Sequence, residues 1–307
     1  MEKAPYLNDI VSDSSDVQAY WLLTKDKVRI RVAIWQGGER GTIFILTGRT
    51  EYIEKYAAIA NLFSKKGYNV VINDWRGQGL SQRFLPNSNI GHVEKFSDYQ
   101  LDLDEVIDTA LNLELPQPFF QISHSMGGCI GLRTLHQKNV FKSSVFTGPM
   151  WKIHGKPLML AAKYVTTLAV GFGLGKRLII GADERNYLHL STPEKNSLTT
   201  DPETFLFLKS QIETHPELNV GGPSWRWLEA AIKESDFLMS RPPPDASALV
   251  ILGTEEVLVD MNTIISYCQD WSKVNLEIIP ETKHEVLMES KVSRDYALNQ
   301  IFSFLES

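Results

Sequence analysis

Short runs of apolar residues, separated by amphipathic stretches such as 52–65 and 96–113, dominate the pattern of this chain. Runs that are apolar throughout are typical of strands buried on both faces, and intervening helices favour parallel pairing. We therefore expect an α/β fold with a mostly parallel sheet covered by helices on both faces. Two β-rich segments within 18–35 predict a hairpin before this sheet. The expected strands of the parallel part are 42–46, 69–73, 119–122, 144–147, 248–252 and 275–279.

The apolar run 119–122 leads directly into residues 123–128, which read SHSMGG. A strand that enters a helix through a tight turn can hold a serine hydroxyl exposed at a sheet edge. Such a turn requires little side chain two positions before and after the serine. Ser123 and Gly127 meet this requirement, although the common pattern has glycine at both positions. Ser125 is therefore the candidate nucleophile, and the alternative is an ordinary strand-to-helix connection.

A nucleophilic serine needs a base and a carboxylate that orients the base, and this architecture supplies them in the chain order serine, acid, histidine. His284 follows the last expected strand, so it can reach the carboxyl edge of the sheet. His124 adjoins Ser125 and is expected to point away along the turn. The histidines that lack such a placement are His92, His136, His154, His189 and His215.

Three carboxylates after the glycine that closes the expected strand 248–252 compete for the role of the acid. Glu256 is preferred, because a side chain three positions after Gly253 leaves the loop toward the histidine. Glu255 is its rival. Asp260 is expected to cap a helix over 261–271 by accepting a backbone hydrogen bond.

The motif at 123–128, the turn 74–81 with the letters DWRGQGLS, and the late acid and histidine resemble the serine α/β-hydrolases. Within these, they are similar to the lysophospholipase and monoacylglycerol lipase group. The resemblance covers the first half and the last quarter of the chain. It implies an α/β-hydrolase fold and the hydrolysis of carboxylic esters through an acyl-enzyme, with no cofactor.

The resemblance also implies an oxyanion hole, here formed by the backbone N–H groups of Arg49 and Met126. The sequence departs from the family pattern at two positions. Thr47 precedes Gly48 where the family often has histidine, which leaves a backbone oxyanion hole possible. Glu256 stands where many relatives have aspartate, and glutamate serves the same role with a longer side chain.

The regular alternation of strands and helices breaks between about 150 and 239 and resumes after the stiff segment 241–244, RPPP. In the hydrolases that the chain resembles, an insertion here forms a cap over the serine. We expect a core of residues 1–149 and 240–307 and a cap of residues 150–239. Apolar stretches at 157–165 and 168–174 predict a packed cap helix rather than a membrane span, because Lys163 interrupts them. They could also form an acyl-chain pocket or touch a membrane surface transiently.

Arg49 suggests a preference among lipid substrates. A guanidinium beside an oxyanion hole would attract phosphate, because its fork of donors matches phosphate oxygens. This would favour lysophospholipids over neutral glycerides. The alternative is a surface ion pair of Arg49 with Glu51 or Glu54.

Several other sites and partners are disfavoured. A net charge of −6 argues against broad nucleic-acid binding. The turn 74–81 lacks the third glycine and the lysine of nucleotide-binding loops, so we expect a structural turn. No metal site is expected, because His284 and Glu285 have no second histidine at metal-binding spacing and Cys129 and Cys268 have no nearby ligands.

A chain of 307 residues with 43% hydrophobic residues is long enough for one catalytic domain with an insertion. Two distant cysteines and the absence of a basic and apolar leader at residues 1–5 favour a reducing cytoplasm. The oligomeric state stays open.

Three alternatives to a lipid esterase remain. One is a short-chain carboxylesterase. Another is an enzyme like the serine aminopeptidases, which would need an acidic group in the cap to bind a substrate amine. The third is a catalytically silent scaffold that keeps only the fold. The candidate acidic groups for an aminopeptidase are Glu213, Glu229 and Glu234.

Overall fold

A computed structural model of the chain describes residues 1–12, 16–154 and 156–307, without the side chains of residues 156–160. In this part of the chain, nine strands form one sheet in the order β1-β2-β3-β5-β4-β6-β7-β8-β9. Pairs from β1 to β5 are antiparallel, and those from β5 through β4 to β9 are parallel. The bounds are β1 Glu2–Lys3, β2 Val17–Leu23, β3 Arg29–Trp35, β4 Thr42–Leu46, β5 Asn69–Asp74, β6 Phe119–His124, β7 Ser143–Thr147, β8 Ala248–Gly253 and β9 Val274–Ile279.

The predicted α/β-hydrolase fold and its strands are confirmed. Strand β4 has the predicted bounds, and the other five predicted strands extend by one or two residues. Strands β2 and β3 form the expected hairpin. Every residue of β4 to β8 is buried, as expected for strands that are covered on both faces.

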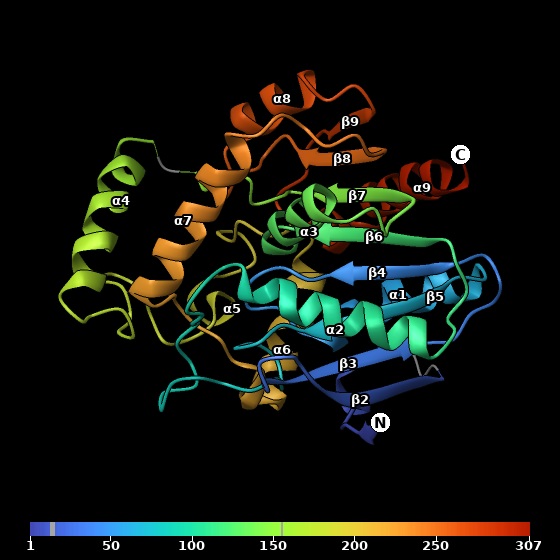
Figure 1. Cartoon of the computed structure of the whole chain (residues 1–307), viewed down its shortest axis with the longest axis horizontal. Coiled ribbons are helices and arrows are strands. Elements are labelled where there is room, and N and C mark those ends of the chain that lie inside the picture. Colours follow the sequence, from blue (N-terminus) through green and yellow to red (C-terminus); the bar gives the residue numbers. More distant parts are fainter. Residues whose placement is uncertain (13–15, 155) are drawn as a thin grey trace.

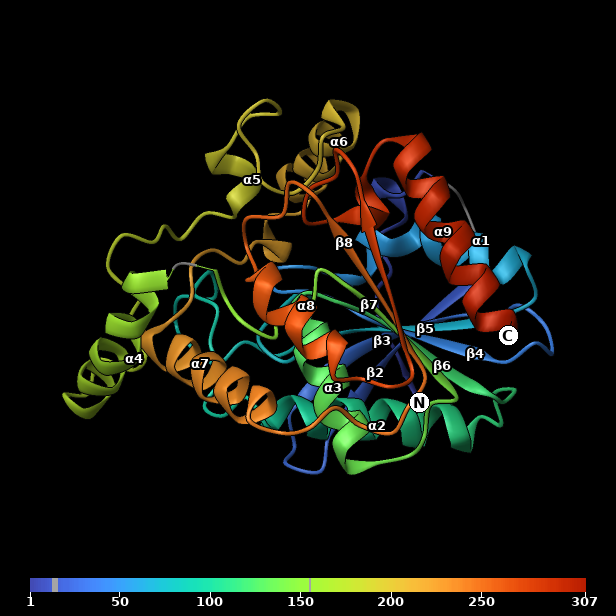
Figure 2. The same ribbon diagram turned by 90° about the horizontal axis from the view of Figure 1, so that it is seen from above.

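Helices pack on both faces of the sheet (Figure 2). Helices α1 and α9 cover one face, and α2, α3 and α8 cover the other. The predicted helix 52–65 begins as a 3-10 turn, Ile53–Tyr56, and becomes α-helical only at Ala57. Further 3-10 turns span Asn8–Ile10, Pro216–Leu218 and Val286–Met288. The helix bounds are α1 Ala57–Lys65, α2 Asp98–Asn112, α3 Met126–Gln137, α8 Met261–Gln269 and α9 Lys291–Glu306.

Between β7 and β8 the chain leaves the sheet, and its described residues there form four α-helices. The parallel strands point their carboxyl ends toward this region, where α4 and α7 pack together (Figure 1). The predicted apolar stretch 157–165 lies within α4, and the side chains of 157–160 fall outside the described residues. Among the helices of the described part, none has the length and apolarity of a membrane span. The bounds are α4 Lys156–Gly171, α5 Tyr187–Leu190, α6 Pro202–Thr214 and α7 Trp225–Met239.

Candidate active site

Ser125 occupies the turn between β6 and α3, with a φ of 49° and a ψ of −112°. A positive φ is strained for serine and persists only where the surrounding structure enforces it. The packing of α3 provides this constraint, because a Cβ atom at Gly127 would lie 2.0 Å from the carbonyl oxygen of Leu46. The N–H of Ser125 donates to the carbonyl of Thr147 at 3.1 Å. The turn therefore holds Ser125 at the carboxyl edge of the sheet.

His284 and Glu256 are in direct contact. The distance from His284 Nδ1 to Glu256 Oε2 is 2.5 Å, and the imidazole is buried. Glu256 Oε1 accepts the N–H groups of Leu258 and Val259 at 2.6 and 3.2 Å. Burial alone would raise the pKa of Glu256, but the His284 contact and these backbone donors lower it below its usual value. An ionised carboxylate thus orients the imidazole and leaves Nε2 as the nitrogen that can take a proton.

The structure separates the three carboxylates that compete for the role of the acid. Glu255 is exposed, whereas Glu256 is buried against His284. Asp260 caps α8, where its carboxylate accepts the N–H of Thr263 at 3.3 Å. Glu256 is therefore placed to orient the imidazole.

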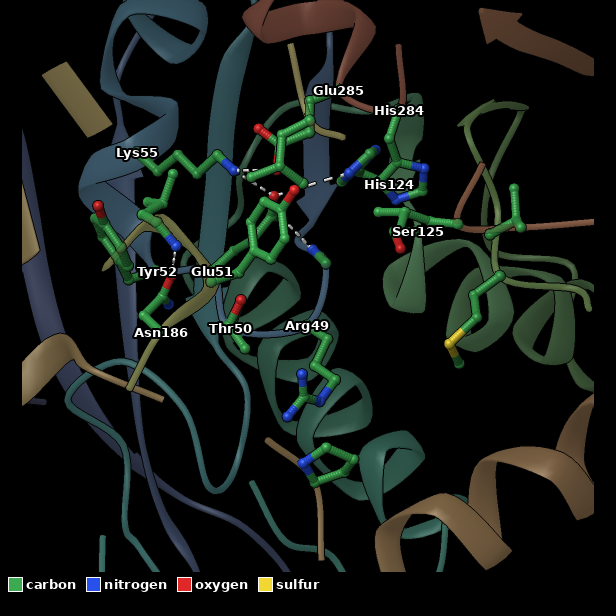
Figure 3. A pocket seen from close by; sticks show the side chains of 18 of the residues that line it. Arg49, Thr50, Glu51, Tyr52, Lys55, His124, Ser125, Asn186, His284 and Glu285 are labelled. Atoms are coloured by element: carbon green, nitrogen blue, oxygen red, sulfur yellow. Dashed lines mark hydrogen bonds and ion pairs between the residues drawn. The ribbon is translucent and has the colours of Figure 1, made fainter. Parts of the chain in front are cut away.

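A cavity of about 350 Å³ contains Ser125 and His284 in its wall. This volume lies in the range of small-molecule sites. Figure 3 shows these two residues with His124 on one side of the cavity, and Arg49 further along it. Much of the remaining lining is apolar. It comes from the segment between β7 and β8 and from the loop after β8, and includes Met150, Ile153, Leu188, Ile212, Trp227 and Leu258.

The two proposed oxyanion donors come from neighbouring turns. Met126 is the first residue of α3, so its N–H has no acceptor within the helix. Arg49 lies on the turn that follows β4 and lines the cavity. Their role in binding an oxyanion stays a prediction.

A buried ionic cluster beside the site was not predicted. The ammonium of Lys55 lies 2.7 Å from Glu51 Oε1 and 2.7 Å from Glu285 Oε1. Glu51 also accepts the N–H of Gly48 and, at 2.8 Å, the hydroxyl of Tyr56. Burial would raise the pKa of Glu51, but Lys55 and the other partners lower it to about 2. The Glu51 carboxylate therefore fixes the turn that carries the Arg49 N–H. The sequence signal for its ion pair with Lys55 was their spacing of four residues.

The prediction that His124 points away from the site is wrong. Its ring lies 4.8 Å from that of His284, between ring centres, and Nδ1 contacts the carbonyl oxygen and hydroxyl of Thr147 at 2.9 and 3.0 Å. Strand β6 continues through His124, so the side chain follows the strand pleat instead of the turn. Burial lowers the pKa of His124 to about 4, which keeps the ring neutral at physiological pH.

Glu51, His124 and Glu285 offer ligand atoms within 4.8 Å of one another. The Lys55 ammonium already lies between the two carboxylates. A cation there would compete with this fixed charge, so we assign no metal to the cluster.

The turn after β5 is structural. The carboxylate of Asp74 accepts the N–H groups of Ile53 and Leu80 at 2.9 and 2.8 Å and contacts Arg31 Nε at 2.8 Å. A Cβ atom at Gly79 would lie 2.1 Å from Asp74 Cγ. The carboxylate itself thus fills the inside of the turn.

The alternative of a surface ion pair for Arg49 is wrong. Glu51 is engaged by Lys55, and Glu54 by Arg31 at 2.8 Å. Arg49 instead donates to the carbonyl of Gly221 and lies over the ring of Trp227, with its Cζ 5.1 Å from the ring centre.

The model of the family described as serine aminopeptidase, S33, matches residues 37–291. The chain belongs to this family. A probable lysophospholipase L2 of Haemophilus influenzae is 28% identical over 268 residues, which cover 87% of this chain and 84% of that protein. Lysophospholipase L2 of Escherichia coli K12 is 27% identical over 275 residues, covering 85% and 79%.

This member of the S33 family also shares its fold with solved lipases. A soluble variant of monoglyceride lipase from Saccharomyces cerevisiae, solved with a substrate analog, aligns over 98% of this chain and 99% of its own. The TM-score is 0.74 and the identity 19%. The predicted resemblance to the lysophospholipase and monoacylglycerol lipase group is confirmed, and the chain is a hydrolase of the esterase and lipase type.

Proposed function

We propose that this protein hydrolyses lipid carboxylic esters as a lysophospholipase or a monoacylglycerol lipase. The observation that carries the proposal is the contact of 2.5 Å between Glu256 and His284, because the same imidazole lines a largely apolar cavity together with Ser125. The lysophospholipase names of the curated relatives support the same substrate class.

In the proposed mechanism, the Ser125 oxygen attacks the ester carbonyl while His284 Nε2 takes the hydroxyl proton. Glu256 stabilises the imidazolium that forms. The backbone N–H groups of Arg49 and Met126 bind the developing oxyanion. His284 then gives the proton to the departing alcohol, and a water activated by the same imidazole cleaves the acyl-enzyme.

We further propose that residues 150–239 act as a cap over the core of residues 1–149 and 240–307. The cavity supports this division, because its lining combines Ser125 and His284 with Leu188 and Trp227 from the inserted segment. Apolar side chains from the cap would bind the acyl chain of the substrate.

An aminopeptidase is less well supported. Its substrate amine would need an acidic cap residue in the cavity, but Glu229 pairs with Arg226 and Lys233, and Glu234 pairs with Arg133. Glu213 lines a different surface hollow. Of the acidic residues that do line the cavity, Glu51 and Glu285 share Lys55.

A panel of p-nitrophenyl esters with increasing acyl length tests the proposed substrate class. We expect kcat/KM to rise with chain length, by up to about four-fold for each methylene that the cavity buries. A short-chain carboxylesterase would prefer acetate or butyrate. Preference for acetate, or faster cleavage of aminoacyl p-nitroanilides than of long esters, would contradict the lipid esterase.

We also propose that the cap touches an anionic membrane surface. Tyr164, Leu168, Phe172 and Ile180 are 61 to 90% exposed on α4 and in the segment 172–180 that follows it. Lys176 and Arg177 nearby are exposed as well. Apolar side chains flanked by basic ones fit a surface of anionic lipid. A cytoplasmic location of the protein is consistent with this proposal.

Vesicle sedimentation tests the membrane contact. The double variant Leu168→Ser, Phe172→Ser should bind phosphatidylglycerol vesicles at least about ten-fold more weakly, because two apolar side chains no longer enter the lipid. Val292→Ser is the matched control, since Val292 is 83% exposed on α9 and should not affect binding. Equal sedimentation of the double variant and the wild type would reject the contact.

A further inference from the structure

Arg49 is a cation in the wall of the cavity without a carboxylate partner among the described residues. Its side chain donates to the carbonyl of Gly221 and stacks over Trp227. The Nε atom is buried and has no hydrogen-bond partner in the described part of the chain. A guanidinium has five N–H donors, so this side chain keeps unused capacity for an acceptor.

Three other arginines that are buried or half-buried show how this fold satisfies such a charge. Arg31 contacts Glu54 and Asp74, Arg76 contacts Asp26 and Asp102, and Arg133 contacts Glu234. Each of these guanidinium groups therefore has an internal anion. Arg49 departs from this arrangement at the cavity that contains Ser125.

Arg83 also has no carboxylate partner in the described ranges, but it differs from Arg49 in position. It donates to four backbone carbonyls, including those of Glu217 and Asn219, close in sequence to the Gly221 partner of Arg49. It is not among the residues that line the cavity. Arg83 thus has a structural role only, because its guanidinium anchors the segment 217–221 to the core through hydrogen bonds.

Burial lowers the pKa of Arg49 to about 10, so the side chain stays charged at neutral pH but is poorly compensated. An anion that enters the cavity would gain a charge-assisted contact with this group. The carboxylates of Glu51 and Glu285 do not serve this purpose, because Lys55 lies between them, apart from Arg49 (Figure 3).

The reach of the side chain matches one position in a lipid substrate. The Arg49 N–H is proposed to bind the ester oxyanion, and the side chain extends away from Ser125 and the imidazoles (Figure 3). Its guanidinium carbon can lie roughly 6 Å from Cα, given ordinary bond lengths. In a lysophospholipid, the phosphorus lies roughly 7 Å from the ester carbonyl when the glycerol is extended. The first distance starts at the residue whose N–H is proposed to face the oxyanion and the second at the ester carbonyl itself, so a guanidinium and a phosphate that extend in the same direction reach similar depths.

We propose that Arg49 binds the phosphate of a lysophospholipid in this cavity and thereby favours phosphate-bearing glycerolipids over neutral monoacylglycerols. This inference rests on the proposed esterase function. The planar fork of the guanidinium would hold two phosphate oxygens at once, which a neutral glycerol head group cannot replace.

The test compares kcat/KM for a lysophosphatidylcholine and a monoacylglycerol with the same acyl chain, below their micellar concentrations. Arg49→Gln should lower the ratio of the two values by about 10- to 100-fold, the usual effect of one hydrogen bond to a charged group. The ratio for Arg49→Lys should lie between those of the wild type and Arg49→Gln, because lysine keeps the positive charge but lacks the planar fork of donors. All three chains keep the backbone N–H at position 49, so a change in the oxyanion hole affects both substrates and cancels in the ratio.

Arg83→Gln is the matched control, and its ratio should equal that of the wild type. An unchanged ratio in Arg49→Gln would overturn the inference. An equal fall in Arg83→Gln would overturn it as well, because it would trace the effect to the anchoring of 217–221. A wild-type protein that cleaves neither lipid would instead reject the proposed function, which keeps the two failures distinct.

Discussion

Ser125→Ala is expected to lower kcat by about a million-fold, as in enzymes where the nucleophile of such a triad is removed. Without the Ser125 oxygen, no acyl-enzyme can form, and His284 has no hydroxyl to deprotonate. The substitution keeps the Cβ atom and adds no bulk to the strained turn. The loss can be measured with a p-nitrophenyl ester and with a fluorophosphonate probe, whose attachment site is read by mass spectrometry.

Ser123→Ala is the matched control for this experiment. Ser123 is fully buried, and its hydroxyl has no hydrogen-bond partner in the described part of the chain. Its removal should therefore leave kcat within about two-fold, since buried groups without partners add little to the native state. Substantial ester hydrolysis by Ser125→Ala would reject Ser125 as the nucleophile. A folded wild type that the probe does not label would favour the silent scaffold.

Glu256→Gln is expected to lower kcat by about ten thousand-fold, the effect of the equivalent acid-to-amide change in serine proteases. A glutamine can offer an N–H to His284 Nδ1 and so favour the wrong tautomer. It also carries no charge to stabilise the imidazolium. Its amide oxygen can still accept the N–H groups of Leu258 and Val259, so the loop should keep its shape.

Glu255→Gln is the control for this second experiment. Its carboxylate is exposed, whereas that of Glu256 contacts His284, so the substitution should change kcat by less than about two-fold. Thermal unfolding of both variants checks that they are folded. A large loss in Glu255→Gln together with an active Glu256→Gln would assign the acid to Glu255 instead.

The strands and the serine turn could be predicted because their causes are local. Strand β4 has the predicted bounds, since Thr42 and four consecutive apolar residues without a breaker leave few alternatives. The small residues around Ser125 indicate that two backbone segments approach closely. In the structure, the backbone at Gly127 packs directly against that of Leu46.

The side-chain partners could not be predicted to the same degree. Arg49 lies two residues from Glu51 and five from Glu54. In the structure, however, Glu51 pairs with Lys55 and Glu54 pairs with Arg31. The orientation of His124 depended on whether β6 ended at Ile122 or continued through His124, because a side chain inside the strand follows the strand pleat. For Arg49, short separation in the sequence was thus a poor guide to the ionic partner.

The amino-acid sequence by itself determined the order of the strands along the chain, the strained turn at Ser125, and three candidates for the acid. Only the tertiary structure decided that Glu256 meets His284 and that Lys55 joins Glu51 to Glu285. It also decided that Arg49 lines the cavity with no carboxylate partner among the described residues. The physical reason is the range of the interactions involved. Strand and turn preferences arise from sterics and apolar patterning among neighbouring residues, whereas these contacts depend on how loops from distant strands meet at one sheet edge.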